Sequence, residues 1–193
     1  MECGFEDFIF SVGYRAELIE TYFGDGSRFG TRIQYLKEEQ PTGTAGCLDM
    51  MRQKLDVPPD ETFLLMNGDI LTELDFGRFI KHHVKGKFEL TVGVKEIERQ
   101  IPYGILEEED GLVRRIIEKP VSHYPISAGI YLLQGSTLPL IPSNTYFTIP
   151  DLVDSLVSKN RRVGSYVIKE YWLAVEHQED MEKARARIEV DSG

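Results

Sequence analysis

The amino-acid sequence predicts a mixed α/β fold of the three-layer, Rossmann-like kind, in which helices flank a mostly parallel sheet. Three observations predict it. Short apolar runs with strand character alternate with segments of helical periodicity, an antiparallel hairpin interrupts this alternation in the second half, and no linker rich in glycine, serine and proline divides the chain. A chain of 193 residues with 41% apolar residues can bury a sizeable core, so we expect one domain over residues 1–193.

The first half of the chain supplies the alternation. Strand character occupies residues 7–12, 32–36 and 63–66, and helical spacing occupies residues 14–23, 45–55 and 76–83. Gly24 and Gly26 end the first helix as C-terminal glycines do, and Asp75 is a suitable N-cap for the third. This order is typical of a doubly wound sheet.

The stretch 63–69, Phe-Leu-Leu-Met-Asn-Gly-Asp, admits two interpretations. Asn67-Gly68 is a strong hairpin signal, which would make Asp69 a solvated turn residue. The alternative is an inner parallel strand, buried on both faces, that carries Asp69 to the edge where ligands of such sheets bind. A hairpin needs a return strand, whereas the residues after Asp75 have helical spacing. We therefore expect Asp69 at the carboxyl end of an inner strand.

The second half adds antiparallel structure. Residues 103–107 and 112–117 flank the turn signal Glu109-Asp110-Gly111 and predict a hairpin. Further strands are expected at 88–94 and 126–133, and further helices at 149–159 and 178–188. The predicted sheet is therefore mixed.

Charge and hydropathy argue against several classes of protein. The formal net charge of −10 disfavours a protein whose main ligand is nucleic-acid backbone, but it is compatible with a metal site and a small phosphorylated ligand. No apolar run approaches the roughly 18 residues that span a bilayer, and the N-terminus lacks the layout of a secretory signal. We expect a cytoplasmic protein without membrane contact. Cys3 and Cys47 match neither a disulfide framework nor a zinc motif, so we expect no chemical role for them.

Several short motifs carry more information by their order than any one carries alone. They are Gly24-Asp25-Gly26, Gln40 to Gly46, Asn67-Gly68-Asp69, Tyr103-Gly104, Glu118-Lys119-Pro120, Ser127 to Tyr131 and Tyr171-Trp172-Leu173. With this order and spacing the chain resembles, over nearly its whole length, the sugar nucleotidyltransferases, also called nucleoside-diphosphate-sugar pyrophosphorylases. The resemblance implies that the ligands are a nucleoside triphosphate and a sugar 1-phosphate, or a nucleotide sugar.

The implied reaction joins the sugar 1-phosphate to the nucleotide. A sugar phosphate oxygen attacks the α-phosphorus and pyrophosphate leaves, which requires positioning and charge neutralisation rather than a covalent nucleophile. Mg²⁺ suits this task, because it takes one or two carboxylates and leaves positions for phosphate oxygens. The resemblance makes Asp69 the main Mg²⁺ ligand and assigns catalytic roles to Asp69 and Lys119.

The resemblance also assigns a nucleotide-binding segment. Gly43, Thr44 and Ala45 open a helix with small residues, so backbone N–H groups there can approach a base or a phosphate closely. Gln40 carries both a donor and an acceptor for a base edge, and Gly68 completes the expected nucleotide-binding set. Without the resemblance, an ordinary helix start with small residues is the favoured interpretation, and the order of the family motifs reverses this preference.

The expected sugar-phosphate site lies in the second half. In the family the Glu of the Glu118-Lys119 pair holds sugar hydroxyls and the Lys meets the phosphate, whereas taken alone the pair is a solvated strand edge. Gly104 and Gly129 match places where backbone passes close to the sugar, although each could be a bulge or a packing glycine. Ser127 stands where many members carry Asn.

Two departures from the family pattern lead us to expect impaired turnover. The family begins with a strand and a glycine-rich, Arg-bearing loop that grips the triphosphate, and no such loop precedes Asp7, so we expect an N-terminally truncated domain. Ala174 stands where many members carry a second metal-binding Asp, and Glu176, two residues along the same strand face, is the candidate replacement ligand. The alternative function is a non-catalytic nucleotide-sugar-binding or regulatory subunit, and a scaffold without such ligands is a third.

The absent opening strand has a structural consequence. In a family-like sheet it would lie between 8–12 and 63–66, leaving two inner edges without a hydrogen-bonding partner. We expect these strands either to pair directly or to pair across a dimer, and on this basis we expect a homo-oligomer.

Overall fold

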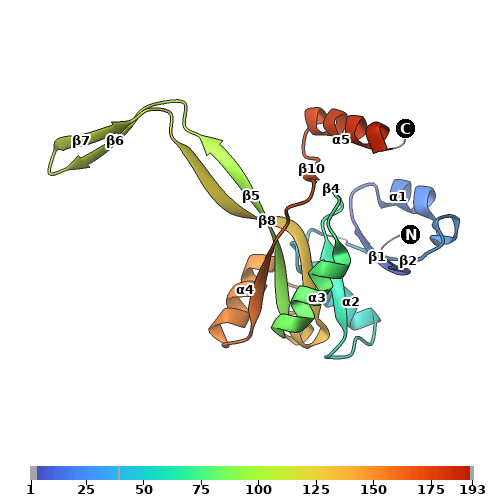
Figure 1. The fold of residues 1–193 in the computed structure, drawn as a ribbon. Coiled ribbons are helices and arrows are strands. Elements are labelled where there is room, and N and C mark those ends of the chain that lie inside the picture. Colours follow the sequence, from blue (N-terminus) through green and yellow to red (C-terminus); the bar gives the residue numbers. More distant parts are fainter. Residues whose placement is uncertain (1–3, 39, 192–193) are drawn as a thin grey trace. The chain divides into compact units, whose positions relative to one another are not determined.

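The computed structural model describes residues 4–38 and 40–191 (Figure 1). The chain divides into two compact units. Unit 1 comprises residues 1–65, 75–91 and 131–164, and unit 2 comprises residues 66–74, 92–130 and 165–193. The expectation of a single domain stays a prediction, and Cys3 lies outside the described residues.

Unit 1 holds most of the helices. Its elements are β1 (Asp7–Val12), α1 (Ala16–Phe23), the 3-10 helix η1 (Ser27–Phe29), β2 (Arg32–Lys37), α2 (Gly46–Lys54), α3 (Phe76–Gly86), the 3-10 helix η2 (Gly135–Leu140) and α4 (Ile149–Ser158). The Asp75 carboxylate accepts a hydrogen bond from the backbone N–H of Arg78 at 2.9 Å, which confirms it as the N-cap of α3. Thr148 forms a capping box with Asp151 at the start of α4.

Unit 2 is made mainly of strands. It holds β4 (Ile70–Thr72), β6 (Ile105–Glu109), β7 (Leu112–Ile117), β10 (Trp172–Ala174) and α5 (Gln178–Asp191). Four further strands carry the chain from one unit into the other along their length: β3 (Thr62–Met66), β5 (Leu90–Gln100), β8 (Val121–Gln134) and β9 (Val163–Val167). None of the helices in residues 4–38 and 40–191 combines the length and the apolar composition of a membrane-spanning segment.

The strands form several small sheets. The mixed α/β class is confirmed, but the described strands do not form one mostly parallel sheet. β1 and β2 form a parallel pair, β3-β8-β5-β9 form a four-stranded sheet, and β4 with β10 and β6 with β7 form antiparallel pairs. The physical reason is that, among the strands of the described residues, β1 pairs with β2 alone, so no described strand joins this pair to the larger sheet.

The same pairing corrects the expectation for β3. This strand lies at the edge of its sheet rather than inside it, and each of its residues is partly exposed rather than buried on both faces. Direct pairing of β1 with β3 is also wrong, because among the described residues the two strands belong to separate sheets. Pairing of these edges across a dimer stays a prediction.

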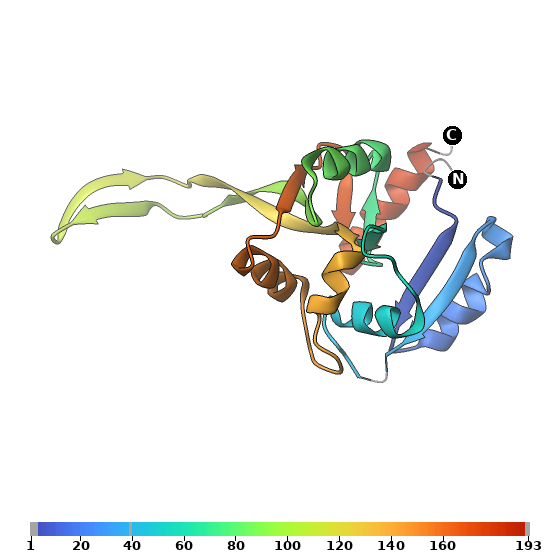
Figure 2. The same ribbon diagram turned by 90° about the horizontal axis from the view of Figure 1, so that it is seen from below.

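Apolar side chains from helices and strands pack together in unit 1. Phe10 of β1 packs edge-on against Phe23 of α1, with ring centroids 5.2 Å apart, so α1 covers one face of the β1–β2 pair (Figure 2). Helices and strands together supply the other buried apolar residues of this unit, which include Phe79, Leu90, Leu132, Leu133, Ile141, Leu152 and Leu156.

Candidate functional site

Asp69 lies in a turn between β3 and β4. These two strands belong to different sheets, so the Asn67-Gly68 signal does not form a hairpin. The sequence predicts a helix directly after the loop that contains Asp69, but the short strand β4 lies between this loop and α3. Two backbone hydrogen bonds hold the turn: the Asn67 N–H donates to the Gly129 carbonyl at 2.9 Å, and the Asp69 carbonyl accepts from the Val175 N–H at 2.8 Å.

The backbone conformation and the close neighbours of position 129 require a glycine there. Its φ is +69°, in the left-handed region, and a Cβ atom there would lie 2.9 Å from the side-chain Nδ2 of Asn67. The Asn67 amide therefore packs directly against the backbone of β8. The Gly129 N–H also lies 3.5 Å from the Ser127 hydroxyl. This brings together Gly68, Asp69, Ser127 and Gly129 of the predicted site.

β10 completes this arrangement within unit 2. Ala174 pairs with Ile70 in the antiparallel β4–β10 ladder, so the chain passes Asp69 and continues to Glu176. The Trp172 indole N–H donates to the Ala128 carbonyl at 2.8 Å, which ties β10 to β8. We define the joined segments 67–69, 127–129 and 172–176 as the Asp69 cluster.

Sequence reasoning missed the residues that hold the Asp69 cluster together. Trp172 lies in the Tyr171-Trp172-Leu173 motif, but its hydrogen bond to β8 depends on a tertiary contact that the sequence does not specify. Lys95 is a second case, because its ammonium donates to the carbonyls of Ile168 at 3.2 Å and Glu170 at 2.8 Å, just before β10. The sequence marks Lys95 only as the charged residue that follows the run Val92-Gly93-Val94, and it does not specify the partners of this lysine.

The Asp69 cluster offers a metal ion few protein ligands. The described residues contain no group of three or more His, Cys, Asp or Glu side chains that could hold a metal ion by themselves. Mg²⁺ does not need such a group, because one or two carboxylates suffice when water and phosphate oxygens complete its octahedron. A single carboxylate that follows a strand end, as Asp69 does, fits that requirement.

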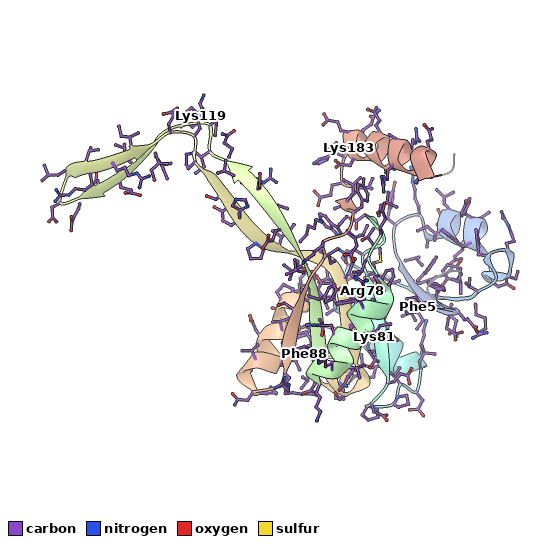
Figure 3. The ribbon with its side chains drawn as sticks, in the orientation of Figure 1. Phe5, Arg78, Lys81, Phe88, Lys119 and Lys183 are labelled. Carbon is purple, nitrogen blue, oxygen red and sulfur yellow. The ribbon has the colours of Figure 1, made fainter. Side chains whose placement is uncertain are left out.

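Three of the predicted sugar-phosphate residues, Gly104, Glu118 and Lys119, lie at the base of the β6–β7 hairpin, apart from Ser127 and Gly129 of the Asp69 cluster. A Cβ atom on Gly104 would lie 3.1 Å from the Glu118 carboxylate, so these two predicted residues are neighbours. Lys119 adopts φ +45° in the loop between β7 and β8, and its carbonyl accepts from the Gln100 side chain at 3.3 Å (Figure 3). β7 ends at Ile117, so the Glu118-Lys119 pair lies in a loop rather than at the end of a strand.

The predicted nucleotide segment lies in unit 1 and is tightly braced. The Glu38 carboxylate accepts from the Thr42 N–H at 3.2 Å and from the Thr42 hydroxyl at 2.9 Å. Phe147 bonds the loop on its other side, since its N–H donates to the Thr42 carbonyl at 2.9 Å and its carbonyl accepts from Ala45 at 3.0 Å. Gly43 adopts φ +85°, and a Cβ atom there would lie 2.5 Å from the Phe147 carbonyl oxygen.

The bracing determines which groups of this segment can meet a ligand. The Thr44 hydroxyl accepts from the Ile149 N–H at 3.0 Å, which satisfies the first turn of α4. The Ala45 side chain is fully buried. Among the described residues, the N–H groups of Gly43 and Thr44 have no acceptor, whereas Gln40 is exposed in the bend before them. The backbone therefore offers two donors beside an exposed amide side chain.

Cys47 lies next to this segment and is chemically inert at neutral pH. Burial, together with the negative charge of Glu38, raises the pKa of its thiol to about 11. The thiol therefore stays protonated and is not a nucleophile.

Comparisons with known proteins identify the family. The pattern of the family described as Nucleotidyl transferase matches residues 1–190. The chain is 30% identical over 184 residues to the probable mannose-1-phosphate guanylyltransferase 3 of Oryza sativa subsp. japonica, which covers 93% of this chain and 51% of the relative. It is 27% identical over 191 residues to the mannose-1-phosphate guanylyltransferase of Mycobacterium tuberculosis, covering 96% and 52%. The chain thus spans about half the length of the curated relatives it matches.

Solved structures support the fold. The crystal structure of HddC from Yersinia pseudotuberculosis matches with a TM-score of 0.72 and 24% identity, over 97% of this chain and 80% of that one. A putative glucose-1-phosphate thymidylyltransferase from Bacillus anthracis matches with a TM-score of 0.72 and 17% identity, over 96% of this chain and 77% of that one. These matches show the fold, and the family pattern over residues 1–190 establishes that the chain belongs to the nucleotidyl transferase family.

Proposed function

We propose that this chain is a sugar-1-phosphate nucleotidyltransferase domain, which transfers a nucleotidyl group from a nucleoside triphosphate to a sugar 1-phosphate with release of pyrophosphate. The observation that carries the proposal is the Asp69 cluster, in which a backbone hydrogen bond to the Gly129 carbonyl and another from the Val175 N–H fix the turn that bears the carboxylate. A fixed carboxylate can hold the divalent cation that neutralises phosphate charge, which is what a reaction without a covalent intermediate needs.

Asp69 is the proposed main Mg²⁺ ligand, with Glu176 as the second. When bound, the ion would neutralise phosphate charge and orient the oxygens of the α-phosphate. The support is that Asp69 follows β3 and that the chain runs past it along β10 toward Glu176.

The proposed nucleotide-binding groups are Gln40, Gly43, Thr44, Ala45 and Gly68. The N–H groups of Gly43 and Thr44, which have no acceptor among the residues described, are suited to donate to carbonyl or ring-nitrogen acceptors of a base, because the bracing of the loop fixes their direction before the ligand arrives. Ala45 contributes through its small size at the start of α2.

The proposed sugar-phosphate site uses Gly104, Glu118, Lys119, Ser127 and Gly129. Glu118 accepts hydrogen bonds from sugar hydroxyls, and the absence of a side chain on Gly104 leaves that carboxylate uncovered. Lys119 neutralises the attacking phosphate and has the second proposed catalytic role.

The test is pyrophosphate release from the full chain with Mg²⁺, using GTP with mannose 1-phosphate and dTTP with glucose 1-phosphate as the first substrate pairs. Asp69→Asn should lower turnover by at least about 100-fold, because it removes the anionic ligand while keeping the size of the side chain. The matched control is Asp110→Asn, since Asp110 lies in the exposed hairpin turn with φ +50°, a conformation that Asn tolerates. Equal activity of the two variants would refute the role of Asp69.

The second candidate is a non-catalytic nucleotide-sugar-binding or regulatory subunit. The observation that favours it is Ala174, which pairs with Ile70 where many family members carry a second carboxylate. Calorimetry with Mg²⁺ and GDP-mannose distinguishes the two, because binding without pyrophosphate release supports the subunit and turnover supports the enzyme. Impaired turnover, a cytoplasmic location and a homo-oligomeric state remain predictions at this point.

A further inference from the structure

The Asp49 carboxylate is buried where two segments that are distant in sequence meet. Asp49 lies on α2 and is 5% exposed. Its Oδ1 accepts a hydrogen bond from the Ser143 hydroxyl at 3.1 Å, and its Oδ2 accepts one from the Asn144 N–H at 3.2 Å. Both donors belong to the loop between η2 and α4, which lies beside α2 (Figure 2). A buried carboxylate therefore fastens this loop to α2.

Two residues of α2 complete the hydrogen bonding of this carboxylate. The Arg52 guanidinium donates to Asp49 and also to the Ser143 hydroxyl, at 2.8 Å, and the Gln53 amide donates to Asp49 Oδ2 at 2.8 Å. Burial would raise the pKa of the Asp49 carboxyl, but the hydrogen bonds from Arg52, Asn144 and Ser143 outweigh it and lower that pKa below its usual 3.8. The carboxylate is therefore ionised at neutral pH.

The fastened loop also forms a wall of the proposed nucleotide-binding segment. Its Phe147 N–H donates to the Thr42 carbonyl at 2.9 Å, and its Phe147 carbonyl accepts from the Ala45 N–H at 3.0 Å. A Cβ atom on Gly43 would lie 2.5 Å from the Phe147 carbonyl oxygen, so the two segments are in close contact. Because such packing leaves no room for independent movement, a shift of Phe147 displaces the backbone of that segment.

The loop needs support from outside itself. Asn144 has φ +53°, in the left-handed region, where a residue other than glycine persists only if its surroundings hold it. The hydrogen bond from the Asn144 N–H to Asp49 is such a support, and the Ser143 hydroxyl supplies another at the preceding residue. The conformation of the loop therefore depends on the buried carboxylate.

We propose that Asp49 is a positioning residue for nucleotide binding, which fixes the loop 143–147 and thereby the direction in which the Gly43 and Thr44 N–H groups face a base. This role rests on the proposed function, because it assumes that residues 43–45 bind the nucleotide. The carboxylate already accepts from donors of α2 and of the loop, so it acts through the loop rather than by contact with the ligand. Donors that are held in place before binding lose less conformational freedom when the ligand arrives.

A second network of the same composition supplies a matched control in unit 1. The Glu89 carboxylate accepts from the Ser136 hydroxyl at 3.0 Å and pairs with the Arg161 guanidinium, and the Glu89 side chain is 23% exposed. Within residues 4–38 and 40–191, these three side chains form no hydrogen bond with the nucleotide-binding segment or with the loop 143–147. Glu89→Gln and Asp49→Asn therefore make the same chemical change, and only the latter alters the support of that loop.

The first experiment measures nucleotide affinity by titration calorimetry of the full chain with Mg²⁺. The nucleotide is the tightest binder among GTP, dTTP, ATP, CTP and UTP. Asp49→Asn should weaken binding at least about tenfold, because an amide loses the charge-assisted hydrogen bonds that hold the loop. Glu89→Gln should bind within about twofold of the wild type, although thermal unfolding should show that both variants lose stability.

Turnover supplies a readout that a general loss of stability would not give. In pyrophosphate release, Asp49→Asn should raise the KM for the nucleotide about tenfold, with a much smaller change in kcat and in the KM for the sugar phosphate. Glu89→Gln should leave all three quantities close to those of the wild type.

Substitutions of Ser143 separate the loop contact from the charge of Asp49. Ser143→Ala keeps the carboxylate but removes a donor of the loop, and it should weaken nucleotide binding about three- to fivefold. Ser143→Thr retains the hydroxyl at an exposed position and should restore the wild-type affinity. If both variants bound as tightly as the wild type, the hydrogen bond between the loop and Asp49 would have no part in nucleotide affinity.

Hydrogen exchange reports on the loop without any ligand. The Ala45 and Phe147 amides form the hydrogen bonds that join the two segments. Both amides should exchange at least about tenfold faster in Asp49→Asn than in the wild type, and at close to the wild-type rate in Glu89→Gln. Unchanged exchange in Asp49→Asn would contradict the dependence of the loop on Asp49.

The binding results also distinguish this role from the proposed function. If wild type and Asp49→Asn bind the nucleotide equally, Asp49 has no positioning role, and the proposed nucleotide-binding segment is unaffected. If Asp49→Asn and Glu89→Gln lose affinity equally, affinity follows stability alone, which also contradicts the role. If the wild type binds none of the five nucleotides, both the proposed nucleotide-binding segment and the role of Asp49 are wrong.

Discussion

At the residue scale, the contact between Gly129 and Asn67 governs the stability of the Asp69 cluster. Gly129→Ala meets both the left-handed backbone, φ +69°, and the Asn67 amide at 2.9 Å. We expect a loss of about 1–3 kcal/mol in the free energy of unfolding, measured by denaturant titration. Gly111→Ala is the control, because Gly111 has a similar φ of +77° and no atom within 4 Å of its added Cβ. A Gly129→Ala loss no larger than the control's would show that the Asn67 contact has no energetic consequence.

Also at the residue scale, substitutions of Ala174 test whether a missing carboxylate at this position weakens turnover. Ala174→Asp restores a carboxylate beside Ile70, one position from the residue that faces Asp69 in the ladder. If Mg²⁺ affinity limits the reaction, this change should lower the Mg²⁺ concentration for half-maximal pyrophosphate release about tenfold. Ala174→Asn has the same size without the charge and should leave the Mg²⁺ dependence unchanged. If pyrophosphate release by Ala174→Asp and Ala174→Asn depended on Mg²⁺ concentration in the same way, the absence of a second carboxylate would not be the cause of weak turnover.

At the element scale, the loop 42–46 and the start of α4 form one unit through the Thr44 hydroxyl. Thr44→Val keeps the shape but removes the acceptor for the Ile149 N–H, which leaves that donor unpaired. We expect a loss of about 1 kcal/mol in stability and a five- to tenfold weaker affinity for GTP with Mg²⁺, because the neighbouring N–H donors lose their fixed direction. Thr44→Ser retains the acceptor and should bind as the wild type does. Titration calorimetry measures the GTP affinity of each variant, and thermal unfolding measures its stability. Equal GTP affinities for Thr44→Val and Thr44→Ser would show that the hydrogen bond of the Thr44 hydroxyl does not affect nucleotide binding.

At the scale of the whole molecule, the sequence predicted what local signals determine. The strand at 7–12, the helix start at Phe76 after the Asp75 cap and the helix beginning at Ile149 are all confirmed. The errors arise where partners are distant in sequence. β4 and β10 have three residues each, too short to show an alternating pattern, and the edge position of β3 depends on which strand β1 selects. Predicted site residues are neighbours within the Asp69 cluster, whereas Trp172 and Lys95 act through tertiary contacts that no local pattern encodes.

The stability of the whole molecule should depend on pH through His83. This side chain is fully buried and its Nδ1 lies 2.8 Å from the Thr91 hydroxyl, and burial, with a smaller contribution from His82, lowers the pKa of His83 below its usual 6.5. Above pH 6.5 the imidazole is neutral in both the folded and unfolded chains. Below that value the unfolded chain binds a proton that the folded chain resists, so stability falls as the pH drops from about 6.5 through the folded pKa. Thermal unfolding between pH 7.5 and 5 should show this decline in the wild type and a flatter profile in His83→Asn, even though that variant is less stable at pH 7.5.

The control is His123→Asn, which removes an exposed histidine and should keep the wild-type dependence of stability on pH. If His83→Asn also kept that dependence, the decline in stability would have to come from other groups.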